Sequence, residues 1–145
     1  EAWAFCGHLD PNRIEYLEDL CADFADIAFV ANRTGMPVAL DELLAQGKPW
    51  EPIPQLKALV LKPTLLGSLA NSEALVARAR ELKLKVIVSS CFESGIGLGQ
   101  LARLAGEWAP DQAPGLDTRR WLARDLLDKQ GQPDPSLMEP LFHRD

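Results

Sequence analysis

The sequence lacks the features that define several broad classes of protein. It has only three cysteines in 145 residues and no CxxC pair, which excludes a disulfide framework and a zinc motif. It has no basic excess: its net charge of −6 argues against a nucleic-acid partner. No apolar run approaches the roughly 18–20 residues that a membrane-spanning helix needs. We therefore expect a cytoplasmic protein with reduced thiols and neither nucleic acid nor membrane as partner.

Motifs that bind nucleotide phosphates are also missing. No GxGxxG or GxxxxGK[ST] sequence follows a predicted strand. The glycine-rich segment GIGLG, residues 95–99, begins a predicted helix but does not have the required spacing. A nucleotide-binding doubly wound sheet therefore has little support.

Short apolar runs alternate with helical patterns along the chain. The hydrophobic share of 47% is enough to form a packed core. Alternation of β-favouring runs with amphipathic segments is typical of parallel βα units. Gly35 follows one such segment, where a glycine favours the end of a helix. The predicted strands are residues 13–18, 37–42, 58–62, 85–90 and 114–118, and the predicted helices are residues 22–35, 71–83, 97–109 and 119–129.

A polar residue stands at the end of each predicted strand. Because the carboxyl ends of parallel strands in a barrel share one rim, these side chains are expected to lie close together. Two carboxylates that converge there repel each other unless a cation lies between them. Mg²⁺ prefers oxygen ligands of this kind. The strand-end residues are Glu18, Asp41, Lys62, the pair Ser89 and Ser90, and Asp117.

Each of these residues also has a simpler interpretation. Glu18 alone fits a solvated strand end, and Asp41 alone fits the N-cap of a short helix. Lys62 alone fits a lysine that meets water at the rim. Ser89 and Ser90 fit hydroxyls that bond to the backbone. The whole set nevertheless favours a metal-assisted βα enzyme, because these features would otherwise have to coincide at one rim by accident.

Several stretches of the sequence resemble o-succinylbenzoate synthases, a family of the enolase superfamily. YLED (16–19) and ALDE (39–42) resemble two strand ends of that family, although Asp19 stands where the family usually has Glu. The more specific matches keep the family's order along the chain, and the resemblance runs from about residue 4 to the last predicted helix. They are LVLKPTLLGSL, VIVSSCFESGIGLGQLARLA and PGLDT.

The resemblance implies an α/β fold, namely the C-terminal portion of an enolase-type TIM barrel. About five βα units would occupy residues 1–130, and residues 131–145 would form a C-terminal tail. The family's N-terminal capping domain, first strands, KxK lysine pair and third metal carboxylate have no counterpart in this chain. We therefore expect the 145 residues alone to be inactive and to self-associate.

The resemblance also implies roles for particular residues. Glu18 and Asp41 would bind Mg²⁺, and Lys62 would face the reacting carbon as a base or as a stabilising charge. Ser89 and Gly115 would lie where the family contacts its substrate. The implied reaction is dehydration of a small-molecule carboxylate, 2-succinyl-6-hydroxy-2,4-cyclohexadiene-1-carboxylate, to o-succinylbenzoate for menaquinone biosynthesis. An N-acylamino acid racemase, a dipeptide epimerase and a non-catalytic half-barrel scaffold remain as alternatives.

Overall fold

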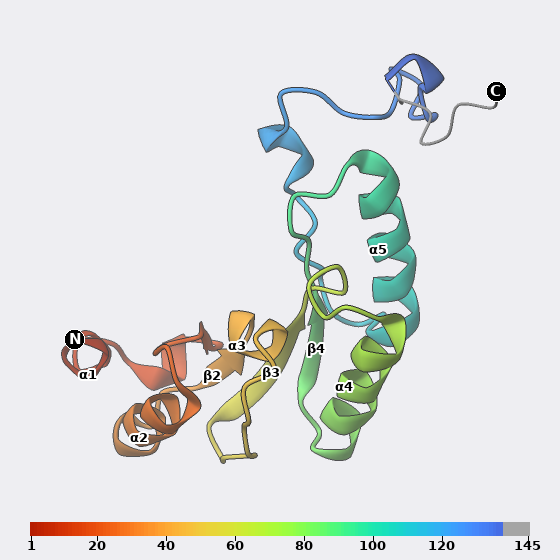
Figure 1. Ribbon diagram of the computed structural model, residues 1–145. Coiled ribbons are helices and arrows are strands. Elements are labelled where there is room, and N and C mark those ends of the chain that lie inside the picture. The colour runs from red at the N-terminus through yellow and green to blue at the C-terminus, as the bar shows by residue number, and fades with distance from the viewer. Residues whose placement is uncertain (138–145) are drawn as a thin grey trace.

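A four-stranded parallel sheet forms the centre of the computed structural model, which describes residues 1–137 (Figure 1). The strands lie side by side in chain order, so the predicted parallel α/β arrangement is confirmed. The strands are β1 (Leu17–Glu18), β2 (Val38–Leu40), β3 (Leu56–Leu61) and β4 (Lys85–Val88), and the α-helices are α1 (Ala2–Cys6), α2 (Phe24–Thr34), α3 (Glu42–Ala45), α4 (Leu69–Glu81) and α5 (Gly95–Trp108).

The two faces of the sheet have different neighbours, because successive side chains of a strand point to opposite faces. One face packs against helices α2, α4 and α5 and forms the main hydrophobic core. The other face, which we call the open face, forms a smaller cluster that includes no helical residue. Strand residues in the main core are Val38, Leu40, Leu56 at the start of β3, Leu59, Leu61, Val86 and Val88. The open face consists of Ala39, Ala58 and Val60 with Tyr16 and Ile87 packed against them.

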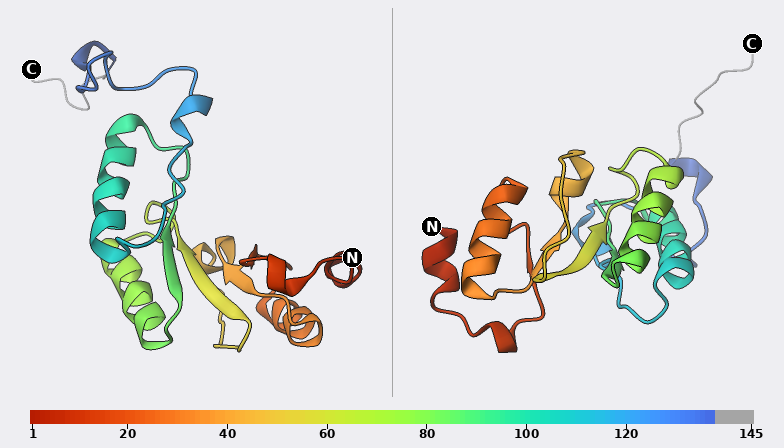
Figure 2. Two further views of the ribbon diagram at one scale, coloured as in Figure 1. Left: turned by 180° about the vertical axis from the view of Figure 1, so that it is seen from behind. Right: turned by 90° about the horizontal axis from the view of Figure 1, so that it is seen from below.

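Local signals in the sequence explain where the helices begin and end. Gly35 adopts the left-handed conformation, with φ of 71°, and its N–H closes helix α2, as predicted. The Ser68 hydroxyl accepts a hydrogen bond from the N–H of Asn71 and so caps the start of α4. Figure 2 shows α1 lying against α2, away from the sheet.

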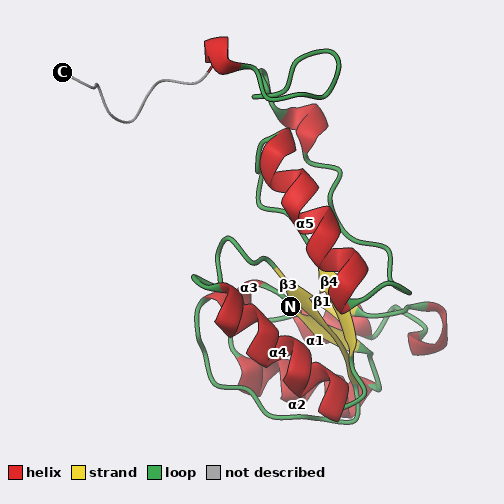
Figure 3. Ribbon diagram, turned by 90° about the vertical axis from the view of Figure 1, so that its right-hand side faces the viewer, coloured by secondary structure: helices red, strands yellow, loops and turns green. Residues whose placement is uncertain are grey.

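The predicted helix over residues 119–129 is wrong. Only a 3₁₀ turn, Arg119–Trp121, forms there, and Figure 3 shows loops and short turns after α5. The Asp125 carboxylate accepts hydrogen bonds from the N–H groups of Leu126 and Gly95, the latter at 2.7 Å. Such a local side-chain bond competes with helical hydrogen bonding, and here it also fastens the segment to the first turn of α5.

The outer strands are shorter than predicted. A 3₁₀ turn at Pro11–Arg13, capped by Asp10, occupies the start of the first predicted strand and leaves β1 with two residues. The fifth predicted strand is reduced to one parallel bridge between Ser89 and Gly115. Within the tail predicted over 131–145, the described part ends with a 3₁₀ turn, Pro135–Leu137, and residues 138–145 lie outside the described residues. No helix among residues 1–137 is long and apolar enough to cross a membrane.

Candidate active site at the carboxyl ends of the strands

Four predicted site residues continue the open face at the carboxyl end of the sheet. Each lies two positions after an open-face residue of its own strand or segment: Glu18 follows Tyr16, Asp41 follows Ala39, Lys62 follows Val60 and Ser89 follows Ile87. Since the side-chain period of a strand is two, all four side chains share the open face. We call Glu18, Asp41, Lys62 and Ser89 the polar rim. The sheet thus places these four residues at one end and on one face.

Lys62 and Asp41 form a close ion pair at the centre of the polar rim. The Lys62 Nζ atom lies 2.6 Å from Asp41 Oδ2 and 2.6 Å from Glu42 Oε1. The side chains of Lys62 and Asp41 are only 14% and 7% exposed, whereas Glu42 is exposed. The other oxygen of Asp41, Oδ1, is buried and has no hydrogen-bond partner within the described residues. Asp41 therefore offers one unused acceptor next to a fixed ammonium group.

The electrostatics of the polar rim follow from this burial. Burial raises the pKa of Asp41 to about 6, although Lys62 acts to lower it, and the charges of Glu42 and Glu18 raise it further. Burial also lowers the pKa of Lys62, but hydrogen bonds to Asp41 and Glu42 outweigh this effect and leave the pKa above its usual value. Lys62 is therefore an ammonium ion at neutral pH.

Asp19 makes a structural contact that the sequence analysis did not single out. Its carboxylate accepts hydrogen bonds from the backbone N–H groups of Asp41, at 3.1 Å, and Leu43, at 2.9 Å. Asp41 occupies the N-cap position of α3 but makes no capping bond with its own side chain. The N-cap interpretation of Asp41 is therefore wrong: Asp19 satisfies the first turn of α3 and leaves the Asp41 carboxylate for Lys62.

We expect Asp19→Ala to lower the free energy of unfolding by about 1–3 kcal/mol, because it leaves two partly buried N–H groups without acceptors. Alanine is also strained at the φ of 36° that Asp19 adopts. Urea unfolding measures the change. Asp19→Asn is the matched control, since asparagine tolerates positive φ and keeps an acceptor oxygen, and it should lose less stability. Equal stability of Asp19→Ala and the original chain would contradict the capping role.

Ser89 and Ser90 both bond to the backbone of the segment that follows α5. Each hydroxyl donates to the Gly115 carbonyl, at 3.3 and 3.0 Å, and Ser90 Oγ also lies 3.0 Å from Thr118 Oγ1. A Cβ atom on Gly115 would lie 2.9 Å from Ser89 Oγ, so a larger residue there would force the Ser89 hydroxyl to move. These contacts support the structural interpretation of the two serines and hold Gly115 beside the polar rim.

The carboxylates fit part of a site for a hard cation. Asp41 Oδ1 is a buried oxygen without a partner, and Glu18 is near enough for its charge to raise the pKa of Asp41. Oxygen donors of this type suit Mg²⁺. Within residues 1–137, however, no three His, Cys, Asp or Glu side chains lie close enough together to hold a metal ion. The described residues therefore provide two candidate ligands and not a complete set.

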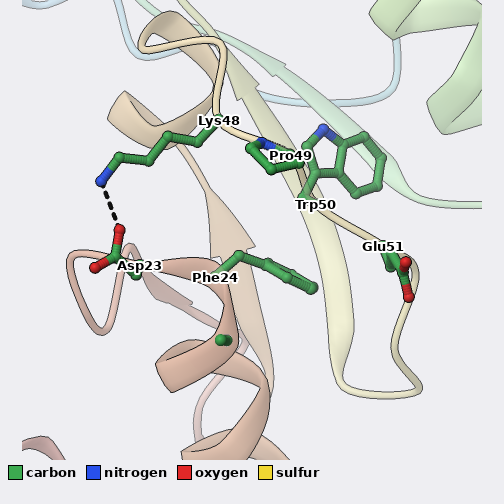
Figure 4. A pocket seen from close by; sticks show the side chains of 7 residues that line it. Asp23, Phe24, Lys48, Pro49, Trp50 and Glu51 are labelled. Atoms are coloured by element: carbon green, nitrogen blue, oxygen red, sulfur yellow. Dashed lines mark hydrogen bonds and ion pairs between the residues drawn. The ribbon is translucent and has the colours of Figure 1, made fainter.

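A separate apolar pocket lies between the start of α2 and the loop before β3 (Figure 4). It has a volume of about 490 Å³, and neither Asp41 nor Lys62 lines it. Phe24, Pro49 and Trp50 form its apolar walls, and Lys48 pairs with Asp23 at 2.8 Å on its edge. This pocket is distinct from the polar rim.

Comparisons with known proteins agree with this fold. The o-succinylbenzoate synthase of Pasteurella multocida is 38% identical over 154 aligned residues, which cover 100% of this chain and 44% of that protein. The crystal structure of MenC from Desulfotalea psychrophila has a TM-score of 0.72 and 22% identity, over 88% of this chain and 38% of that one. An enolase from Pseudomonas fluorescens with bound magnesium, potassium and tartrate has a TM-score of 0.57 and 20% identity, over 83% of this chain and 29% of that one. No family model matches the chain.

The fold matches 37–38% of the length of solved structures with the enolase-type barrel, so the predicted fold class, a portion of such a barrel, is confirmed. Over its whole length the chain is a homologue of the o-succinylbenzoate synthases, so the resemblance seen in the sequence is also confirmed. The chain spans less than half the length of the curated relatives it matches.

Proposed function

We propose that these residues form the part of an o-succinylbenzoate synthase that carries two metal ligands and one active-site lysine. The observation that supports this proposal is the pairing of Lys62 with Asp41 on the open face, with Asp41 Oδ1 left unbonded. The reaction would be dehydration of 2-succinyl-6-hydroxy-2,4-cyclohexadiene-1-carboxylate to o-succinylbenzoate. Its substrate is a small carboxylate, and removal of a proton next to that carboxylate is the difficult step.

Glu18 and Asp41 would hold Mg²⁺ together with at least one carboxylate from outside the described residues. The bound cation would stabilise the negative charge that develops on the substrate's carboxylate when the proton leaves. Asp19 would contribute indirectly, because its bonds to the N–H groups of Asp41 and Leu43 fix the backbone from which Asp41 projects. This arrangement holds the Asp41 carboxylate in place without occupying it as a helix cap.

Lys62 would act as the fixed positive charge beside the reacting carbon. The resemblance leaves open whether this lysine is a base or a stabilising charge. Its raised pKa keeps it protonated at neutral pH, and two carboxylates hold its ammonium group in position. A charge fixed before the reaction stabilises a developing enolate more effectively than one that must reorganise. The state described here therefore favours the stabilising role.

A chimera tests the proposal. In it, this chain replaces the matching 44% of the Pasteurella multocida o-succinylbenzoate synthase. We expect the chimera to form o-succinylbenzoate in the presence of Mg²⁺, because the chain would supply Glu18, Asp41 and Lys62 in the right order. Product is measured by chromatography against the unaltered enzyme. A folded chimera that binds Mg²⁺ but forms no product would contradict the proposed reaction.

A further inference from the structure

A second cavity lies at the opposite end of the sheet from the polar rim. It has a volume of about 440 Å³ and is lined by residues at or before the starts of the strands. Lys85 is the first residue of β4, and Lys57 is the second residue of β3. Glu15 and Pro37 precede β1 and β2. The cavity is therefore separate from the site proposed above for catalysis.

This cavity concentrates positive charge in an acidic protein. Its lining includes Lys57, Lys83 and Lys85, which are three of the six lysines in the sequence, and we call it the lysine cavity. Glu15 is the only carboxylate in the lining, while the whole chain has a net charge of −6. Charges of one sign gathered in a concave surface strengthen the local potential. The lysine cavity thus has a local excess of positive charge in a chain whose net charge is negative.

The three ammonium groups are held to different degrees. Lys85 Nζ lies 2.6 Å from Glu15 Oε1, and Lys57 Nζ donates to the Pro54 carbonyl at 2.8 Å. Among the described residues 1–137, no ion pair or side-chain hydrogen bond engages the ammonium group of Lys83. Within the described residues, the Lys83 ammonium group is thus free to bind a ligand, whereas those of Lys57 and Lys85 each already have one partner.

Lys83 occupies a backbone position that normally favours glycine. Its φ is 57°, in the left-handed region, directly after the end of α4. The Leu84 N–H donates to the Ala79 carbonyl at 2.8 Å, which is the bonding pattern of a glycine-terminated helix. A residue with a side chain costs roughly 1 kcal/mol or more in this conformation. Lys83 therefore stands where glycine would be more stable, so its side chain can be removed without straining the backbone.

We propose that the lysine cavity binds a small polyanion that carries phosphate groups, through Lys57, Lys83 and Lys85. Three ammonium groups and one carboxylate leave two positive charges in the cavity. An anion with at least two negative charges balances them, which favours phosphate esters over monocarboxylates. Ile14 and Pro37 supply apolar wall for the uncharged body of such a molecule. The proposal does not depend on the reaction at the polar rim, because the two sites share no residue.

Isothermal titration of the 145-residue chain with pyrophosphate and with ADP tests the proposal. We expect saturable binding that weakens as salt is added, since salt screens exposed charges. Lys83→Gly should weaken binding by about tenfold while the urea midpoint stays the same or rises, because glycine suits the left-handed backbone. Lys129→Gln is the matched control: it removes one exposed charge outside the cavity and should leave binding unchanged.

The outcomes separate a ligand site from a structural cluster. Tighter binding of ADP than of pyrophosphate would assign the site to a nucleotide, and equal binding would assign it to the phosphate groups alone. If Lys83→Gly does not fold, Lys83→Asn replaces it, because asparagine also tolerates positive φ. Absence of saturable binding, or unchanged binding after loss of Lys83, would overturn the proposal. In the chimera Lys83→Gly should leave turnover unchanged, so failure of this site is distinguishable from failure of the proposed function.

Discussion

Lys62→Ala in the chimera is expected to lower kcat by at least about 10²–10⁴-fold at saturating substrate and Mg²⁺, because it removes a positioned charge from the reaction centre. The ammonium group of Lys62 lies 2.6 Å from carboxylate oxygens of both Asp41 and Glu42, so it is fixed before substrate arrives. In Lys62→Ala, water that fills the space of the lost side chain cannot supply a fixed positive charge at this position. Steady-state kinetics measure the loss.

The control for this variant must separate chemistry from folding. Lys62→Ala leaves Asp41, whose side chain is only 7% exposed, without its ion-pair partner, and an unpaired buried charge is destabilising. Circular dichroism and a urea midpoint establish that the variant is folded, and Lys62→Gln provides a second version that keeps more of the side-chain volume. Lys129→Ala should leave kcat unchanged. Near-normal kcat in a folded Lys62→Ala variant would rule out Lys62 as an active-site charge.

Residues 1–145 on their own are expected to show no turnover above background, even with millimolar Mg²⁺. Residues 1–137 contain no cluster of three potential metal ligands, and two carboxylates alone would bind a hard cation weakly. Among the described residues no helix packs on the open face, and β1 and β4 are the two edges of the sheet. Open strand edges favour association, so we also expect species larger than a monomer.

Two measurements on one preparation decide this prediction. Product formation is followed with the chimera as the positive control, and light scattering after gel filtration gives the mass in solution. A chain that is monomeric and forms product at a rate comparable to the chimera would show that the described residues are sufficient for catalysis. That result would contradict the two-ligand interpretation of the polar rim.

The centre of the fold could be predicted from the sequence because it depends on burial. The run Ala58–Leu61 is apolar on both faces, as a central parallel strand requires, and Lys62 marks the point where it leaves the core. Asp41 follows β2 in the same way. Since parallel strands all end at the same side of the sheet, the order of polar residues along the chain was enough to bring Asp41 and Lys62 together.

Other features depend on contacts between distant segments, which periodicity does not reveal. Residues 119–129 have a helical pattern, but the bond between Asp125 and Gly95 joins positions 30 residues apart and holds the segment in another conformation. The role of Asp19 depends on hydrogen bonds to Asp41 and Leu43, which lie 22 and 24 positions later in the chain. Acidic residues often follow a strand, so the residue type alone does not distinguish Asp19. Its positive φ does distinguish it, but the sequence does not show that angle.

The position of Asp19 has a consequence for how this region can vary. Helix α3 is a single turn, and the residue at its start would ordinarily have to cap it. Here the neighbouring strand end provides the cap, so the backbone at Asp41 is anchored from β1 and not from the segment that follows. We therefore expect substitutions at the exposed positions Gln46, Gly47 and Pro49 after α3 to leave Asp41 in place, whereas Trp50 and Ile53 of the same loop pack against the main core. The backbone position of Asp41 thus depends on Asp19 and not on the sequence of the loop that follows α3.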